Sequence, residues 1–162
     1  MIRLPALALG LTATLLGVVV SDANRVAPAK MRAANTQAQS PAQLPSVDLP
    51  PELNRVLRDY ERHWKASDGA ALSALFTEDG FIARGPWIRG RDAIRAAYSA
   101  SSGGDLRLRA VGYASSDTVG YIVGGYRYGE ATSDGGKFIL ALRRAPLGDW
   151  KIAADLDAAS RQ

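Results

Sequence analysis

The chain has 162 residues, no cysteine and a formal net charge of +4. Its length suits one domain of ordinary size, and its apolar and charged fractions of 47% and 22% are those of a globular protein. The lack of cysteine excludes disulfides, thiolate nucleophiles and cysteine-ligated zinc.

Residues 1–23 have the pattern of a secretory signal peptide. Arg3 is followed by an uncharged apolar run from Leu4 to Val20, and small residues suited to cleavage come after it. An uncleaved membrane anchor is the alternative, because the run reaches the lower limit for a membrane span. We therefore expect a periplasmic or secreted protein, with membrane contact only if this segment is uncleaved.

The next stretch, residues 24–49, is rich in Ala, Gln, Ser and Pro and has no hydrophobic periodicity. This composition predicts a flexible linker, so residues 50–162 must form the domain. The domain holds 16 Lys and Arg against 14 Asp and Glu, which are interspersed along the sequence. A net charge of +2 does not indicate a nucleic-acid partner.

Two helices are predicted at the start of the domain. Pro50 and Pro51 begin the first, whose apolar residues recur at helical spacing: Leu53, Val56, Leu57, Tyr60 and Trp64. Residues 67–69 (Ser-Asp-Gly) end this helix, and a short second helix with Leu72, Leu75 and Phe76 inward is expected to end over residues 77–80.

The chain then changes direction twice before a third helix. Residues 81–83 predict a short strand, Gly85-Pro86 a turn, and residues 87–88 a second extended piece. The third helix begins near Arg91 and ends before the Ser-Ser-Gly-Gly sequence at 101–104.

Four strands are predicted after the helices, at residues 105–114, 117–130, 135–144 and 149–157, with turns at hairpin spacing. Helices followed by strands indicate an α+β domain with one antiparallel, strongly bent sheet. Both faces of the second strand are apolar, which predicts that another layer covers the face turned away from the helices.

This order of elements resembles the nuclear transport factor 2-like superfamily, and within it the SnoaL-like and ketosteroid-isomerase-related branch. The resemblance covers about residues 52–158, and its matching stretches are HWKASDGAALSALFTEDG, IRGRDAI and the Trp-Lys-Ile of the last strand. It implies a cone-shaped curved antiparallel sheet wrapped around the three helices, with a pocket against the first helix. Members include isomerases, cyclases, dehydratases, epoxide hydrolases and binding proteins, and many form dimers through the convex sheet face. A homodimer of that kind is therefore expected.

Two residues are candidates for a general base in such a pocket. His63, the only histidine, lies near the apolar face of the first helix, where a hydrogen-bonded boundary residue is the alternative. Asp155 points outward under strict alternation if the apolar residues of the last strand fill the core: Trp150, Ile152 and Leu156. A bulge would reverse this direction. Asp157 is expected at the frayed end of the strand.

Five aromatic residues are candidates for binding a ligand: Tyr60, Trp64, Trp87, Tyr98 and Tyr126. Trp87, beside Gly85-Pro86, is expected to be the ring that faces the ligand, and core packing is the alternative for the others. One histidine, no cysteine and no suitably spaced carboxylates give no indication of a metal site, and no cofactor is predicted.

The sequence therefore predicts an exported domain that binds a small apolar or amphipathic molecule, or that acts as a dimeric interaction module, without strong catalysis. The alternative is an isomerase, cyclase or dehydratase. In that case His63 or Asp155 is the base and a tyrosine is the electrophilic partner.

Overall fold

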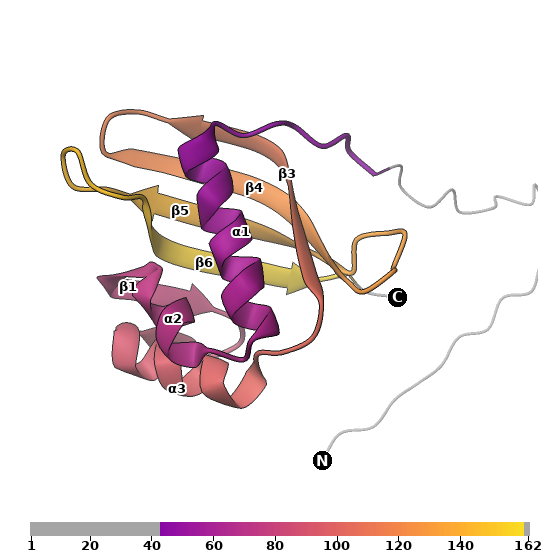
Figure 1. The fold of residues 1–162 in the computed structure, drawn as a ribbon, viewed down its shortest axis with the longest axis horizontal. Coiled ribbons are helices and arrows are strands. Elements are labelled where there is room, and N and C mark those ends of the chain that lie inside the picture. The colour runs from indigo at the N-terminus through magenta and orange to yellow at the C-terminus, as the bar shows by residue number, and fades with distance from the viewer. Residues whose placement is uncertain (1–42, 161–162) are drawn as a thin grey trace, which may run out of the picture. The chain divides into compact units, whose positions relative to one another are not determined.

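The computed structural model describes residues 43–160, which form three helices and one six-stranded sheet (Figure 1). The predicted signal peptide and residues 24–42 of the predicted linker lie outside this range. Within residues 43–160, no helix is long and apolar enough to cross a membrane.

Helix α1 spans Pro51–Lys65 and helix α2 spans Gly69–Ala74, close to their predicted positions. Pro51 lies in the first turn of α1, where the N–H that proline lacks would have no partner within the helix. Asp68 caps α2, because its Oδ1 accepts a hydrogen bond from the Ala71 N–H at 2.9 Å. The apolar face predicted for α1 is buried.

The other elements follow in chain order: β1 (Phe76–Ala83), β2 (Trp87–Arg89), α3 (Arg91–Ser101), β3 (Leu106–Ser115), β4 (Val119–Tyr128), β5 (Gly136–Arg143) and β6 (Lys151–Ala159). β1 begins at Phe76, where the sequence predicts the end of the second helix. That prediction is wrong because Phe76 pairs with Ile152 of β6, a partner that no local pattern reveals.

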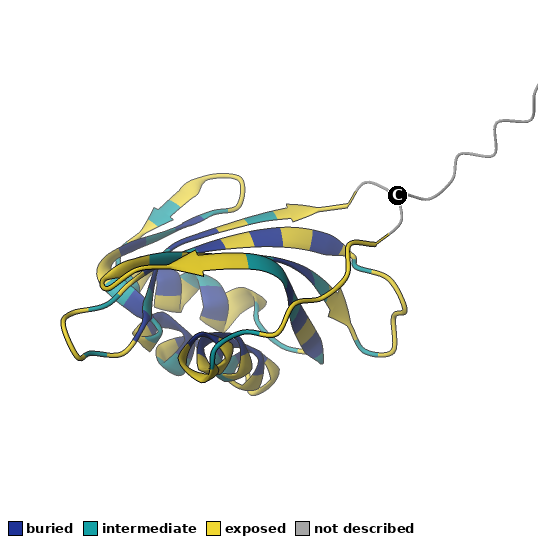
Figure 2. Cartoon of the chain, turned by 90° about the horizontal axis from the view of Figure 1, so that it is seen from above, coloured by how far each residue is buried: buried dark blue, intermediate teal, exposed yellow. Residues whose placement is uncertain are grey.

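The strand order is β2-β1-β6-β5-β4-β3, and the sheet is open. Every neighbouring pair is antiparallel except β1 and β6, which are parallel. The three helices lie on one face of the curved sheet (Figures 1 and 2). The α+β class and the curved sheet around three helices are confirmed, with a mixed sheet in place of the purely antiparallel one.

The core fills the space between the helices and the concave face of the sheet. Its fully buried members come from all layers, including Leu57 of α1, Tyr98 of α3 and Ile122 of β4. Gly124 allows the close packing of β4 and β5, since a Cβ there would lie 2.4 Å from the ring of Phe138.

Residues 44–49, at the end of the predicted linker, lie along the edge strand β3. The Val47 N–H donates to the carbonyl of Ala110 at 3.0 Å, and Arg109 donates to the carbonyl of Leu44 at 2.7 Å. These bonds occupy part of the free backbone edge that an outer strand presents.

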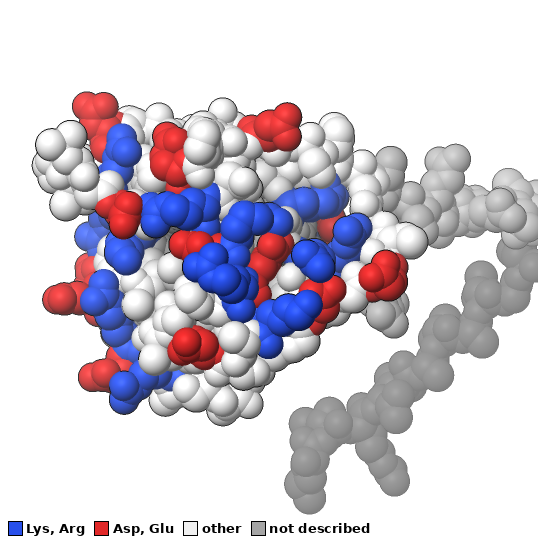
Figure 3. Space-filling view, viewed as in Figure 1, with Lys and Arg blue, Asp and Glu red and all other residues white. Residues whose placement is uncertain are grey.

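Charged residues of both signs are interspersed over the face seen in Figure 3. Many of them form ion pairs, such as Arg55 with Asp149 at 2.7 Å and Arg62 with Asp59 at 2.8 Å.

Candidate functional site

A cavity of about 30 Å³ lies between α1 and the sheet, with room for one or two water molecules. Aromatic rings and aliphatic side chains form most of its wall. Its charged residues are Arg84, Asp155 and Asp157, and three tyrosines also line it: Tyr60, Tyr126 and Tyr128. We call it the Asp155 cavity.

A bulge in β6 turns Asp155 toward this cavity. Ile152 and Ala154 pair with two consecutive residues of β5, so Ala153 is an extra residue in β6. The extra residue exchanges the two faces of the strand beyond it. As a result, Asp155 is only 4% exposed and Leu156 is 39% exposed. Strict alternation therefore fails in β6, and the alternative of a bulge that turns Asp155 inward is the arrangement observed.

Two tyrosines hold one oxygen of the Asp155 carboxylate. The hydroxyls of Tyr60 and Tyr98 donate to Oδ2 at 3.0 and 3.1 Å, and the two hydroxyl oxygens are 2.8 Å apart. The rings of these tyrosines pack edge to face, which fixes both hydroxyls. The other carboxylate oxygen, Oδ1, has no hydrogen-bond partner among residues 43–160.

Burial raises the pKa of Asp155 to about 6, although the two tyrosine hydrogen bonds oppose the rise. Burial also raises the pKa of both Tyr60 and Tyr98, so both stay protonated. Oδ2 and the two hydroxyl oxygens make three mutual contacts of 2.8 to 3.1 Å. The two hydroxyl protons can make hydrogen bonds at only two of these contacts. When Asp155 is protonated, its own proton makes the third hydrogen bond. The site therefore accommodates both states of a carboxyl that titrates close to neutral pH.

Beside Asp155, an arginine and a second carboxylate form an ion pair in the cavity wall. Arg84 follows the end of β1, and its Nε donates to Oδ1 of Asp157 at 3.0 Å. The guanidinium carbon of Arg84 lies 5.8 Å from the ring centre of Trp64. The indole N–H of Trp64 donates to the carbonyl of Gly103 at 2.6 Å, which fixes the ring. Asp157 pairs in register within β6, so its predicted place at a frayed end is wrong.

Most of the predicted site residues come together at this cavity. Tyr60, Trp64, Tyr126 and Asp155 line it, and Tyr98 contacts Asp155.

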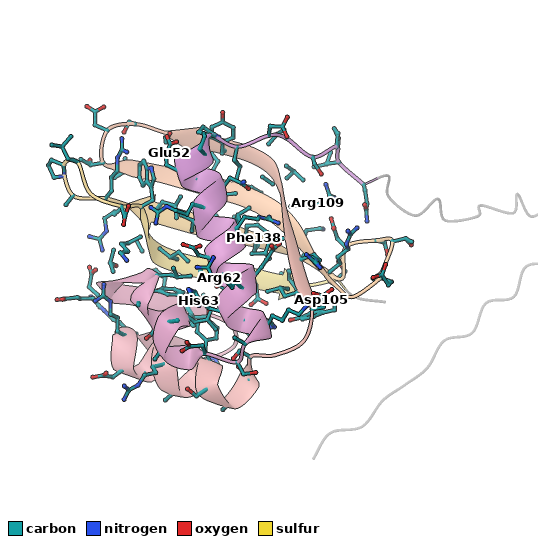
Figure 4. All side chains as sticks on the ribbon, in the orientation of Figure 1. Glu52, Arg62, His63, Asp105, Arg109 and Phe138 are labelled. Carbon is teal, nitrogen blue, oxygen red and sulfur yellow. The ribbon has the colours of Figure 1, made fainter. Side chains whose placement is uncertain are left out.

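His63 and Trp87 lie outside the lining of the Asp155 cavity. Successive residues of a helix point about 100° apart, so His63 does not point in the direction of its neighbour Trp64, which lines the cavity. Nε2 of His63 lies 3.5 Å from the guanidinium of Arg62 (Figure 4). Trp87 belongs to the edge strand β2, is 73% exposed and packs against Phe81 with ring centres 5.4 Å apart.

Sequence reasoning missed Arg84, Asp157 and Tyr128 as cavity residues. Asp157 follows Asp155 by two positions, and Tyr128 follows Tyr126 by two, so each pair shares one face of its strand. This spacing is a readable signal, but it needs the bulge at Ala153 to show which face of β6 is inward.

No three His, Cys, Asp or Glu side chains are grouped to hold a metal ion in the part of the chain that the structure describes.

No protein-family model and no curated protein matches this sequence. Solved structures are nevertheless similar in fold. An NTF-2 like protein of unknown function from Shewanella oneidensis is 21% identical, with a TM-score of 0.56 over 65% of this chain and 95% of that one. A ketosteroid isomerase-like protein from Erwinia carotovora is 16% identical, with a TM-score of 0.54 over 67% and 94%.

A third similar structure is an NTF2-like protein with a cystatin-like fold from Novosphingobium aromaticivorans. It is 20% identical, with a TM-score of 0.51 over 67% of this chain and 79% of that one. The domain therefore has the nuclear transport factor 2-like fold that the sequence resemblance predicts. At these identities the likeness establishes the fold alone, and function has to be argued from the site.

Proposed function

We propose that the domain binds a small apolar or amphipathic molecule in the Asp155 cavity, with Asp155 as the acceptor for its polar group. One observation carries this proposal. Two tyrosines hold Oδ2 of a buried carboxylate, while Oδ1 has no partner within residues 43–160 in an aromatic cavity. Ligand sites typically combine apolar walls with a few fixed polar groups of this kind.

The free oxygen gives the cavity a reason to accept a ligand. Oδ1 is not a sealed acceptor, because the only buried side-chain nitrogen or oxygen without a partner in residues 43–160 is Nε1 of Trp150; a water can reach Oδ1, and a ligand N–H or O–H would replace that water. The cavity measures about 30 Å³, so a compact ligand of one ring or a short chain enters only when a wall side chain moves aside, and Arg84, whose side chain is 45% exposed, is placed to do so. Tyr60 and Trp64, stacked with ring centres 6.1 Å apart, supply a flat apolar wall for such a ligand.

Screening single-ring alcohols and amines by ligand-observed NMR at pH 8 tests this function. We expect Asp155→Asn to lower the affinity for the compounds that bind at least tenfold, since the variant loses a charge-assisted hydrogen bond. The matched control is Asp117→Asn, which changes an exposed carboxylate away from the cavity. Compounds that bind Asp155→Asn as tightly as Asp117→Asn would exclude Asp155 as the acceptor.

Acid–base catalysis is a second candidate, favoured by the pKa of about 6 for Asp155 and by its immobilised carboxylate. Tyr126 and Tyr128 line the same cavity, and neither hydroxyl has a hydrogen-bond partner in the described range, so a substrate oxygen could take one of them as a donor. One similar solved structure is described as ketosteroid isomerase-like. Asp155, rather than His63, would be the base.

An assay with a simple ketone in place of the unknown substrate tests the second candidate. The α-protons of cyclopentanone exchange with deuterium when a general base removes them, and NMR follows the exchange in D₂O. We expect faster exchange with the protein than with buffer, and loss of that gain in Asp155→Asn. Equal rates with protein and buffer would count against catalysis on carbonyl compounds.

We also propose that two copies associate through the convex face of the sheet. Tyr121, Ile139 and Leu156 are 45%, 44% and 39% exposed there, and Ile139 pairs with both Val123 and Leu156 on the neighbouring strands. Contiguous exposed apolar groups favour an interface. We expect Ile139→Glu to convert a dimer to a monomer in analytical ultracentrifugation. A wild-type monomer at micromolar concentration would contradict this proposal.

The location outside the cytoplasm remains a proposal from the sequence of residues 1–23. Mass spectrometry of the protein purified from its own cells tests it. We expect a mature N-terminus after Ala23 or Ala29, whereas an intact Met1 would favour the membrane anchor.

A further inference from the structure

Arg84 is the only cationic side chain that lines the Asp155 cavity within residues 43–160. It is also weakly attached. Its one hydrogen bond in the described range goes to Asp157, and its side chain is 45% exposed whereas that of Asp157 is 16% exposed. Arg84 lies in the turn after β1, followed by Gly85 with φ 73° and nothing packed within 4 Å of its Cβ position. The guanidinium can therefore swing out while Asp157 and Trp64 stay in place.

The groups around Arg84 suit a positive charge. Asp155 and Asp157 together outweigh the single guanidinium, so the cavity carries a net charge of −1 when Asp155 is ionised. Arg84 makes no hydrogen bond to Asp155 among the described residues, which leaves that carboxylate free for another partner.

The aromatic wall favours a cation in the same way. The ring centres of Trp64 and Tyr128 lie 6.4 Å apart, and those of Tyr128 and Tyr126 lie 6.2 Å apart. Aromatic faces attract cations, most strongly that of tryptophan, and Arg84 already lies over Trp64. An anionic ligand would instead meet two carboxylates.

We propose that the Asp155 cavity binds a small organic cation, an amine or quaternary ammonium with a compact apolar body, and that Arg84 occupies part of this site until the ligand displaces it. The incoming cation takes the positions over Trp64 and beside Asp157 and also reaches Asp155, which Arg84 does not. This inference rests on the proposed binding function and adds the charge class of the ligand.

Calorimetric titration of the full mature protein at pH 8 tests the inference. The probes are (2-hydroxyethyl)trimethylammonium and its neutral isostere 3,3-dimethylbutan-1-ol, which share size and shape but differ in charge. We expect the cation to bind at least tenfold more tightly than the isostere. Arg84→Ala should tighten cation binding at least fivefold, and Asp157→Asn should weaken it at least fivefold.

Two further variants test whether the effect of Arg84→Ala is specific to that arginine. Arg84→Gln keeps most of the side-chain length and should also tighten cation binding. Arg89→Ala removes an exposed arginine of the neighbouring strand β2 and should leave the affinity unchanged. Equal gains from Arg84→Ala and Arg89→Ala would mean a general charge effect and would overturn the role given to Arg84.

The outcomes separate this inference from the proposed function. Binding of the neutral isostere as tightly as the cation, with loss in Asp155→Asn, would overturn the cation inference and leave the binding function intact. Unchanged cation affinity in both Arg84 variants would overturn the displacement of Arg84. If neither these probes nor any alcohol or amine of the NMR screen binds, the binding function fails as well.

Discussion

Two buried carboxylates of this domain, Glu61 and Asp155, show how different surroundings lead to different roles. Glu61 is 8% exposed, and both its oxygens are engaged: Oε1 accepts from the Leu108 N–H at 2.6 Å, and Oε2 pairs with Arg58 at 2.7 Å. Arg58 also donates to the carbonyl of Leu108 at 2.7 Å. Glu61 therefore fastens α1 to β3.

Asp155 is also buried, at 4% exposed, but in the described part of the chain it has neither a backbone N–H donor nor a cationic partner. Its hydrogen bonds come from the neutral hydroxyls of Tyr60 and Tyr98, and no residue within 43–160 forms an ion pair with it. Burial raises the pKa of both carboxyls, and at Glu61 a backbone N–H and a cation oppose the rise. Burial alone therefore does not identify a functional carboxylate. A buried carboxylate indicates function when its charge is left uncompensated and one oxygen is free.

The largest expected effect is on stability, from Glu61→Ala. The variant leaves the buried Leu108 N–H without its acceptor, which costs about 1–3 kcal/mol, and losing the pair with the 44%-exposed Arg58 adds up to about 1 kcal/mol. Urea unfolding at pH 7.5 measures the change, with Glu130→Ala as the exposed control. A loss below about 1 kcal/mol would mean that Glu61 does not fasten the helix.

Asp155→Asn should change the free energy of unfolding in the opposite direction and stabilise the domain. The pKa of Asp155 is about 6 in the folded protein and about 3.9 in an unfolded chain, so between these values the folded state binds more protons. The free energy of unfolding therefore falls as pH rises from about 4 to about 6, and the loss is complete above pH 6.

Removing the charge should restore that stability. At pH 7.5 we expect Asp155→Asn to be more stable than the wild type by about 2 kcal/mol, and at pH 4 to be nearly equal to it. Urea unfolding at both pH values checks the sign. A variant that is less stable at pH 7.5 would place Asp155 with Glu61 as a structural carboxylate.

A smaller change tests the tyrosine pair. Tyr60→Phe removes one donor to Oδ2, which stabilises the ionised carboxylate, so the pKa of Asp155 should rise above 6. NMR titration of the carboxyl carbon measures it. Tyr113→Phe, on β3 and 38% exposed, is the control. An unchanged pKa in Tyr60→Phe would show that Tyr98 alone sets the environment of the carboxyl.

Much of the fold was predictable because its signals are local. Helical spacing identified α1, turn residues separated the last four strands, and the resemblance supplied the arrangement. The start of β1 was not predictable, because it depends on pairing with β6, more than seventy positions away in sequence.

The site was predictable in composition but not in geometry. Tyr60 and Trp64 followed from helical spacing. The direction of Asp155 depended on one extra residue, Ala153, that no strand pattern reveals. Arg84 was missed because a single arginine in a turn has no sequence signal until Asp157 and Trp64 are seen beside it.

The smallest expected effect concerns the two predicted residues that lie outside the cavity. His63→Gln and Trp87→Ala should each change the affinity for a cavity ligand less than twofold, since neither side chain lines the Asp155 cavity. Trp64→Phe is the contrasting variant, because it keeps an aromatic ring but loses the hydrogen bond to Gly103 and the wider indole face. We expect it to weaken a cationic ligand at least threefold in the same titration. If Trp87→Ala weakened ligand binding more than Trp64→Phe, the ligand would bind at the exposed turn before β2. The sequence-based assignment of Trp87 would then be right, and the Asp155 cavity would not be the binding site.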